Sequence, residues 1–298
     1  MGSGLYFILT MTEPLIKDVS DTAFWIAHLR AVESERADAL VRDPLAGRLA
    51  GRHGREVSAA MPMERMIAWH VAIRTRIIDD YLSRAIAEGI DCVLNLGAGL
   101  DTRPYRMDLP PSLRWIEADY PRVIEYKEEL LAGERAHGQL VREKIDLADL
   151  PERRRLLASV NEQSKRLLVL TEGVVPYLTN DETAALADDL RALDHAAYWI
   201  VDYVSAQAMK FRKRKGMDRA MQNAPFRFEP ADWFTFFEQH GWKPKEMRYI
   251  APEGERLGRP IPLPWVMKTA MRVAGLFMPE EKRKAMHQFM GYALLQPS

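Results

Sequence analysis

The chain has 298 residues, with 42 basic and 42 acidic side chains, so its formal net charge is zero. A balanced charge gives no general attraction to nucleic acid or to an acidic membrane. The only cysteine, Cys92, excludes an internal disulfide and a cysteine-based zinc site, and it is typical of a cytoplasmic protein. The length is sufficient for a large buried core in one or two domains.

Residues 1–17 are expected to form a flexible leader, because their apolar run is too short for a membrane span and lacks the basic flank of a signal peptide. Residues 18–88 then predict a helical cap that precedes the rest of the fold. Its helix signals are, in chain order, Ser20 or Asp21 as the first cap, Pro44 early in a second helix, and a long third helix over 63–87.

From residue 89 to 298 short apolar runs alternate with helical runs such as 181–193, which is the rhythm of a parallel sheet with crossover helices. We therefore predict one globular α/β unit with a Rossmann-like sheet of seven strands, mostly parallel, with an antiparallel last strand. The predicted strands lie near residues 91–96, 113–118, 139–144, 167–171, 198–203, 242–249 and 291–296.

Two segments are candidate lids over a binding site. Residues 205–230 contain a basic run at 211–215, which is either a solvated helix face or a clamp for an anionic substrate. Residues 250–289 form a long insertion between the last two predicted strands. Its apolar stretch includes Trp265, Met267, Met271, Leu276 and Phe277, which either pack on the core or line the site of an apolar substrate.

The most informative motif follows the strand near 91–96, where Gly97-Ala98-Gly99 leads to Asp101 and then Thr102. Small residues at a strand–turn–helix junction let backbone approach a ligand. A dinucleotide site would require a third glycine where Thr102 stands, so a nicotinamide-dependent oxidoreductase is the weaker alternative. S-adenosylmethionine, which has no pyrophosphate, suits this turn better. Asp101 either caps the turn or belongs to the cofactor network.

Acidic residues follow three further predicted strands. Asp119 ends the second strand about 20 residues after the glycines, the spacing at which a carboxylate meets a ribose diol. Asp146 and Leu147 offer an acceptor and an apolar neighbour for an adenine ring, and Glu172 follows the buried run 167–171. Because parallel strands end at the same edge of a sheet, these residues predict one crevice.

Together these motifs resemble the leucine carboxyl methyltransferase superfamily, in particular its bacterial branch of S-adenosylmethionine-dependent methyltransferases. The resemblance runs from about residue 18 to the end of the chain. The segments that carry it are 21–25, 42–46, Arg74-Thr75-Arg76, the run 97–106, 117–119 and the run 171–178. It implies a methyltransferase fold and S-adenosyl-L-methionine as the cofactor.

The resemblance also implies roles for individual side chains. Arg74 would bind the carboxylate of the cofactor's methionine part, as suits the fork of a guanidinium. The other implied contacts are Gly97, Ala98 and Gly99 to the methionine part, Asp119 to the ribose, Asp146 and Leu147 to the adenine, and Glu172 near the ammonium group.

The methyl acceptor is a small molecule in our interpretation, and no metal is required. Family members that act on a protein C-terminus carry a Tyr-Glu pair where this chain has Tyr203 followed by Val204, and a lysine where it has residues 22–24, so a protein substrate is the weaker alternative. Tyr177 and Tyr203, at or just past strand ends, are the candidates for contact with the acceptor. The pattern does not distinguish a carboxylate from a hydroxyl acceptor, nor does it define the oligomeric state.

Overall fold

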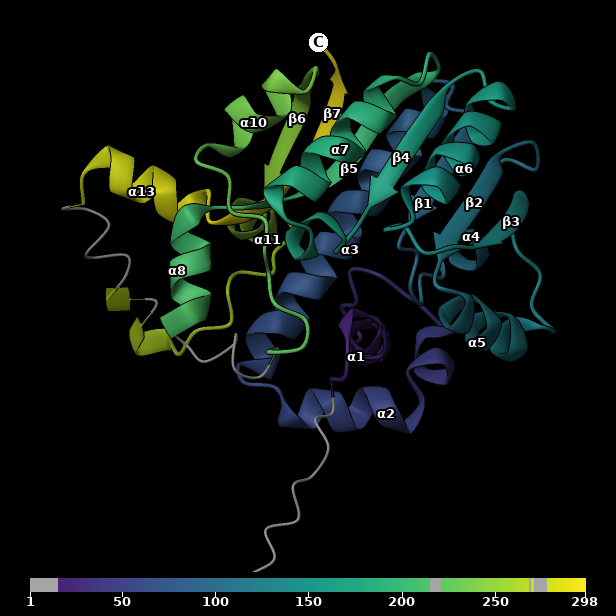
Figure 1. The fold of residues 1–298 in the computed structure, drawn as a ribbon. Coiled ribbons are helices and arrows are strands. Elements are labelled where there is room, and N and C mark those ends of the chain that lie inside the picture. The colour runs from purple at the N-terminus through teal and green to yellow at the C-terminus, as the bar shows by residue number, and fades with distance from the viewer. Residues whose placement is uncertain (1–15, 215–220, 268, 271–277) are drawn as a thin grey trace, which may run out of the picture.

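The sheet has seven strands in the order β3-β2-β1-β4-β5-β7-β6, and β7 runs antiparallel to both of its neighbours (Figure 1). This confirms the predicted fold class. The computed structural model describes residues 16–214, 221–267, 269–270 and 278–298, so nearly all of the expected leader lies outside the described residues. The strands are β1 (Cys92–Leu96), β2 (Arg114–Asp119), β3 (Gln139–Lys144), β4 (Leu167–Thr171), β5 (Ala196–Val204), β6 (Trp242–Tyr249) and β7 (Met290–Pro297).

Helices cover both faces of the sheet. Apolar side chains of α6, α7 and α10 pack on one face, and those of α3 and α11 pack on the other. The helices and the short helical turn η1 are α1 (Val19–Ser34), α2 (Ala46–Ala60), α3 (Glu64–Ala87), α4 (Arg103–Arg106), α5 (Pro121–Leu131), α6 (Leu150–Glu162), η1 (Val175–Tyr177), α7 (Asn180–Arg191), α8 (Ala206–Arg214), α10 (Trp233–Gln239), α11 (Ile250–Arg256) and α13 (Glu280–His287).

The central strands β1 and β4 are buried along their whole length. Both are nearly continuous apolar runs because a parallel strand covered by helices has no solvent face. The one polar residue in β1, Asn95, is only 2% exposed, and its amide donates a hydrogen bond to Asp101 Oδ2 at 3.0 Å. Asn95 therefore ties the central strand to the turn that follows it.

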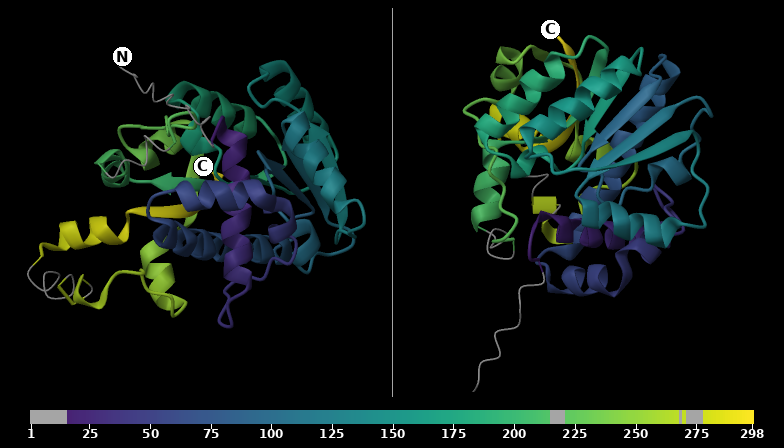
Figure 2. Two further views of the ribbon diagram at one scale, coloured as in Figure 1. Left: turned by 90° about the horizontal axis from the view of Figure 1, so that it is seen from below. Right: turned by 45° about the vertical axis from the view of Figure 1, so that its right-hand side comes forward.

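The strand order reverses between β1 and β4, since the chain continues to β2 and β3 on one side and to β5 on the other. In such a sheet a crevice opens where the two directions diverge, at the carboxyl ends of the strands. Helices α1 and α2 pack against each other at this edge, and the views in Figures 1 and 2 agree on that placement. The helical cap thus covers the strand ends.

The beginning of the cap differs in detail from the prediction. The first helix is capped by Asp18, whose carboxylate accepts a hydrogen bond from Ser20 N at 2.8 Å, and not by Ser20 or Asp21. The extended backbone of Asp18 allows this geometry, whereas Ser20 and Asp21 are already helical. The second helix begins two residues after Pro44.

The insertion between β6 and β7 contains α11 and α13. In its described part the side chains of Trp265, Val266 and Met267 are well exposed, with Trp265 at 77%. Within the portion of the chain that the structure describes, none of the helices combines the length and the apolar character needed to cross a bilayer.

Candidate active site

A cavity of about 620 Å³ opens at the carboxyl edge of the sheet. Its walls come from the turns after β1, β2 and β4, the loop after β3, and one side of α1. The volume lies within the range of about 300–1,000 Å³ that is common for small-molecule sites. Residues from the two halves of the chain therefore form one cavity at the predicted crevice.

The turn after β1 needs its glycines for the packing of the protein itself. Gly97 has a φ of +65°, and a Cβ atom there would lie 2.5 Å from Val174 Cγ2. Gly99 has a φ of +48°, and a Cβ atom there would lie 3.2 Å from Ala23 Cβ in α1. Positive φ and close neighbours both favour glycine. Together with Ala98, the two glycines line the cavity, as the sequence predicts.

Asp119 connects the end of β2 to the glycine turn. One carboxylate oxygen accepts a hydrogen bond from Gly99 N at 2.6 Å, and the other accepts one from Tyr120 N at 2.7 Å. Burial raises the pKa of this carboxyl, and the two backbone N–H groups act against that rise. Asp119 also lines the cavity, and each of its oxygens retains a further acceptor site.

The loop after β3 contributes an apolar wall. Ile145, Leu147, Ala148 and Leu150 line the cavity there. Asp146 is exposed, accepts a hydrogen bond from Ala148 N at 2.9 Å, and is not among the residues that line the cavity. Of the predicted pair, the structure therefore brings Leu147 to the site and leaves the Asp146 side chain in the loop.

Arg103, for which the sequence indicated no role, is the centre of the charged part of the site. It is 2% exposed and contacts three carboxylates: Asp79 at 2.8 Å, Asp101 at 2.6 Å and Glu172 at 2.7 Å. Asp101 also accepts a hydrogen bond from the Arg103 backbone N–H at 2.8 Å, so it caps the turn and takes part in this ion network within the protein. In the sequence, the only signal for the role of Arg103 was its place in the Asp101-Thr102-Arg103 run, directly after the glycine turn.

Arg74 reaches the same network from α3. Its Nε atom lies 2.7 Å from Glu172 Oε1, but without the geometry of a hydrogen bond. Burial acts to raise the pKa of Glu172, and the neighbouring Arg103 and Arg74 outweigh it and hold the pKa below its ordinary value. Both Arg74 and Glu172 line the cavity. The structure thus brings together the two side chains predicted for the methionine part of the cofactor.

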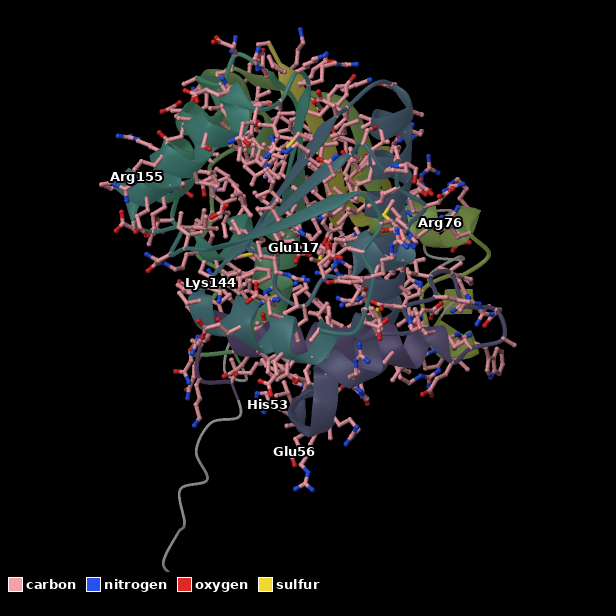
Figure 3. All side chains as sticks on the ribbon, turned by 90° about the vertical axis from the view of Figure 1, so that its right-hand side faces the viewer. His53, Glu56, Arg76, Glu117, Lys144 and Arg155 are labelled. Atoms are coloured by element: carbon pink, nitrogen blue, oxygen red, sulfur yellow. The ribbon has the colours of Figure 1, made fainter. Side chains whose placement is uncertain are left out.

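Arg76, two residues further along α3, faces away from the cavity. Its Nε atom lies 2.9 Å from Oδ1 of Asp80, four residues further along the helix, and its side chain is 46% exposed. Figure 3 shows Arg76 at the periphery of the molecule, while Glu117 lies inside it. Asp79, next to Asp80 in the sequence, pairs with Arg103 and Arg106.

The two candidate tyrosines lie in different places. Tyr177 lines the cavity, and burial raises the pKa of its phenol, which therefore stays protonated at neutral pH. Tyr203 is not among the lining residues, and its ring packs against Trp233, Phe234 and Tyr249. Successive residues of a strand point to opposite faces. The neighbouring residue of β5, Asp202, does not line the cavity either, but it contacts the lining residue Gly173.

Asp202 contacts residues that form the cofactor side of the site. Its Oδ2 atom accepts a hydrogen bond from Gly173 N at 2.9 Å, and the hydroxyl of Tyr292 on β7 lies beside both Asp202 and Arg74. Burial raises the pKa of Asp202 from 3.8 to about 6, although Arg74 attracts the charged form. The folded protein therefore binds a proton here that the unfolded chain has already released.

This difference predicts a measurable pH dependence. A raised folded-state pKa contributes stability at low pH that is lost as the pH rises through about 6. Asp202→Asn keeps an acceptor for Gly173 N and has no charge to bury. Its free energy of unfolding relative to the wild type should therefore increase between about pH 4.5 and 7. Urea titrations across this range measure the difference, and a pH-independent difference would contradict the assignment.

Of the two candidate lids, only one contributes a described residue to the cavity. Arg227 is the one residue from 205–230 that lines the cavity, within what the structure describes of that segment. From 250–289 no described residue lines it, and Met271, Leu276 and Phe277 lie outside the described residues. The covering wall comes from α1, which was predicted as a helix but not as part of the site.

The sheet order, the crevice and the capping helices define a Rossmann-like α/β protein with a methyltransferase-like fold. The chain belongs to the leucine carboxyl methyltransferase family, whose profile matches residues 23–191, from α1 to the end of α7. A solved structure from Thermobifida fusca, titled as a provisionally assigned methyltransferase, has a TM-score of 0.57 at 14% identity and covers 96% of this chain and 97% of its own.

The relatives by sequence include proteins from actinobacteria. One from Mycobacteroides abscessus is 30% identical over 287 residues, covering 84% of this chain and 92% of the relative. One from Mycolicibacterium paratuberculosis is 31% identical over 278 residues, covering 82% of this chain and 85% of the relative. Both carry names that assign them provisionally as S-adenosyl-L-methionine-dependent methyltransferases.

Proposed function

We propose that this chain, an S-adenosylmethionine-dependent methyltransferase (EC 2.1.1.-), transfers a methyl group to a carboxylate or hydroxyl oxygen of a small, apolar metabolite in the cytoplasm. One observation supports the proposal above all. The strand order β2-β1-β4 aligns Asp119, the glycine turn and Glu172 along one cavity, with Arg74 beside Glu172. S-adenosylmethionine carries a ribose and an amino acid joined by a short linker. Its binding requires a partner for the ribose and partners for the amino acid along one cavity, as these residues are arranged.

The residues present fit that cofactor. Arg74 Nε lies in the site without a hydrogen-bond partner, so its guanidinium can serve the methionine carboxylate, and Glu172 can accept from the ammonium group. The remaining acceptor sites of Asp119 suit the ribose hydroxyls. Leu147 and its apolar neighbours after β3 suit the adenine ring.

The protein's part in the reaction is to orient the acceptor and to exclude water. When bound, the cofactor supplies a methyl group on a positively charged sulfur. Helix α1 closes the cavity over the strand ends, which keeps the reacting atoms away from solvent. The protonated phenol of Tyr177 can donate a hydrogen bond to an acceptor oxygen. A carboxylate acceptor is ionised at neutral pH and needs no base.

Transfer of a radiolabelled methyl group tests the proposed function. The enzyme would be incubated with labelled S-adenosylmethionine and matched sets of apolar carboxylic acids and phenols. A carboxyl methyl ester releases labelled methanol in alkali, whereas a phenyl ether does not, so the product identifies the acceptor class. Absence of transfer to both sets, in an enzyme that binds the demethylated cofactor, would contradict a small apolar acceptor.

Asp119→Ala tests the ribose assignment. We expect the affinity for the demethylated cofactor to fall by about 1–3 kcal/mol, the usual cost of losing hydrogen bonds to a charged group. Titration calorimetry measures this, with the exposed Asp108→Ala as the control. Because Asp119 also holds two backbone N–H groups, thermal unfolding is followed in parallel. Unchanged affinity, or a loss that only follows a smaller folded fraction, would contradict a role in binding the ribose.

A further inference from the structure

Most arginines of the cavity are committed to carboxylates of the protein. The five that have largely buried carboxylate partners within 3 Å are Arg30 with Asp43, Arg74 with Glu172, Arg103 with Asp79, Asp101 and Glu172, Arg106 with Asp79, and Arg153 with Asp189. Their charges are balanced by carboxylates of the protein, so these side chains hold the site together, and of the five only Arg74 is also assigned to a ligand, the carboxylate of the cofactor.

Arg227 is different. Its closest carboxylate oxygen is Glu182 Oε2, 3.5 Å from Nη1, and both side chains are 48% exposed. Glu182 already accepts a hydrogen bond from Thr179 N at 2.7 Å as part of a helix cap. An exposed ion pair of this kind contributes at most about 1 kcal/mol. Among the described residues this is the only ion pair of the Arg227 guanidinium, so its donors remain available at the cavity.

The backbone around Arg227 is nevertheless fixed beside the acceptor candidate Tyr177. Arg227 N donates a hydrogen bond to Pro176 O at 2.8 Å, and the Phe226 ring packs edge-on against the Tyr177 ring with 5.1 Å between centroids. Tyr177 in turn belongs to an apolar cluster with Trp25 of α1. The cationic side chain of Arg227 thus lies at one end of an apolar wall, next to the Tyr177 phenol that is proposed to contact the acceptor.

We propose that Arg227 binds an anionic group on the methyl acceptor, so that the acceptor is an apolar molecule with a carboxylate, sulfonate or phosphate group. This inference rests on the proposed function, because it assigns the Tyr177 side of the cavity to the acceptor. The anion replaces Glu182 as the partner of Arg227, and a planar guanidinium suits oxyanions of this kind. The apolar body lies against Trp25 and Tyr177.

A pair of fluorescent probes tests this without knowledge of the natural acceptor. Anilinonaphthalene sulfonate and phenylnaphthylamine share one apolar body, and only the first carries an anionic group. In the presence of saturating demethylated cofactor, Arg227→Gln should weaken binding of the sulfonate about tenfold and change binding of the neutral probe less than about twofold. Glu182→Gln, which keeps the helix cap, should strengthen sulfonate binding.

The matched control is Arg155→Gln, since Arg155 is also an exposed arginine with a weak partner, Glu152 at 3.6 Å, and lies outside the cavity lining. Unchanged sulfonate affinity in Arg227→Gln, equal losses for both probes, or no saturable sulfonate binding by the wild type would each overturn the proposal. Calorimetry with the demethylated cofactor on the same proteins separates this result from failure of the proposed function, because the Arg227 variant should bind that cofactor normally.

Discussion

Replacing Arg103 with leucine is expected to destabilise the protein by about 3–5 kcal/mol, the cost of removing one partner from a buried ion network. Arg103 separates three carboxylates, and among the described residues it is the only ion-pair partner of Asp101. Urea unfolding at neutral pH measures the effect. Arg155→Leu, which removes an exposed arginine, should change stability by less than about 1 kcal/mol.

The same substitution has a defined pH dependence. Arg103 and its neighbours hold the pKa values of Asp79, Asp101 and Glu172 below their ordinary range, even though burial acts to raise them. A lowered folded-state pKa contributes stability above the unfolded value that is lost as the pH falls. The difference between wild type and Arg103→Leu should therefore shrink below about pH 4. A constant difference would mean that leucine acts through packing alone.

Arg74→Lys is expected to weaken binding of the demethylated cofactor by about 10- to 100-fold, corresponding to about 1.5–3 kcal/mol. Lysine keeps the charge but cannot contact Glu172 and a ligand carboxylate with one planar fork. Because the charge balance of the site is retained, thermal stability should change much less than affinity. Titration calorimetry and thermal unfolding on the same protein separate the two effects.

The control for Arg74 is present on the same helix. Arg76→Lys changes an exposed arginine that pairs with Asp80 on the outside, and it should leave cofactor affinity unchanged. If Arg76→Lys were the damaging substitution and Arg74→Lys silent, the carboxylate of the cofactor would have to lie elsewhere. Equal losses of cofactor affinity in both variants would indicate a change in helix α3 as a whole, and not the loss of one contact with the cofactor.

The sheet and its binding edge could be predicted from sequence because their signals are local. A parallel strand buried on both faces is a continuous apolar run, and its end is marked by glycine or an acid. The residues Gly97, Asp119 and Glu172 all follow such runs directly, and the structure places all three on the cavity. Arg74, which precedes the sheet, was identified only through the resemblance to a family.

Local sequence patterns did not predict the direction of side chains near a strand end, nor did they predict how elements distant in the sequence pack together. Asp202 and Tyr203 are adjacent, and only the placement of β5 in the sheet decides which one contacts the residues that line the site. Asp146 is directed by its own turn, through the bond to Ala148 N. The cover provided by α1 depends on long-range packing, which a helix signal near residue 20 does not contain.

The place of β7 between β5 and β6 determines when the protein can finish folding. Until residues 290–297 have been synthesised, β5 exposes one row of backbone hydrogen-bonding groups and β6 has no neighbour in this sheet. An open edge of this kind invites pairing with other chains. Tyr292, which lies beside Arg74 and Asp202, arrives with the same strand. The pairing of β7 thus covers the open edge of β5 and brings Tyr292 to Arg74 and Asp202 in one step.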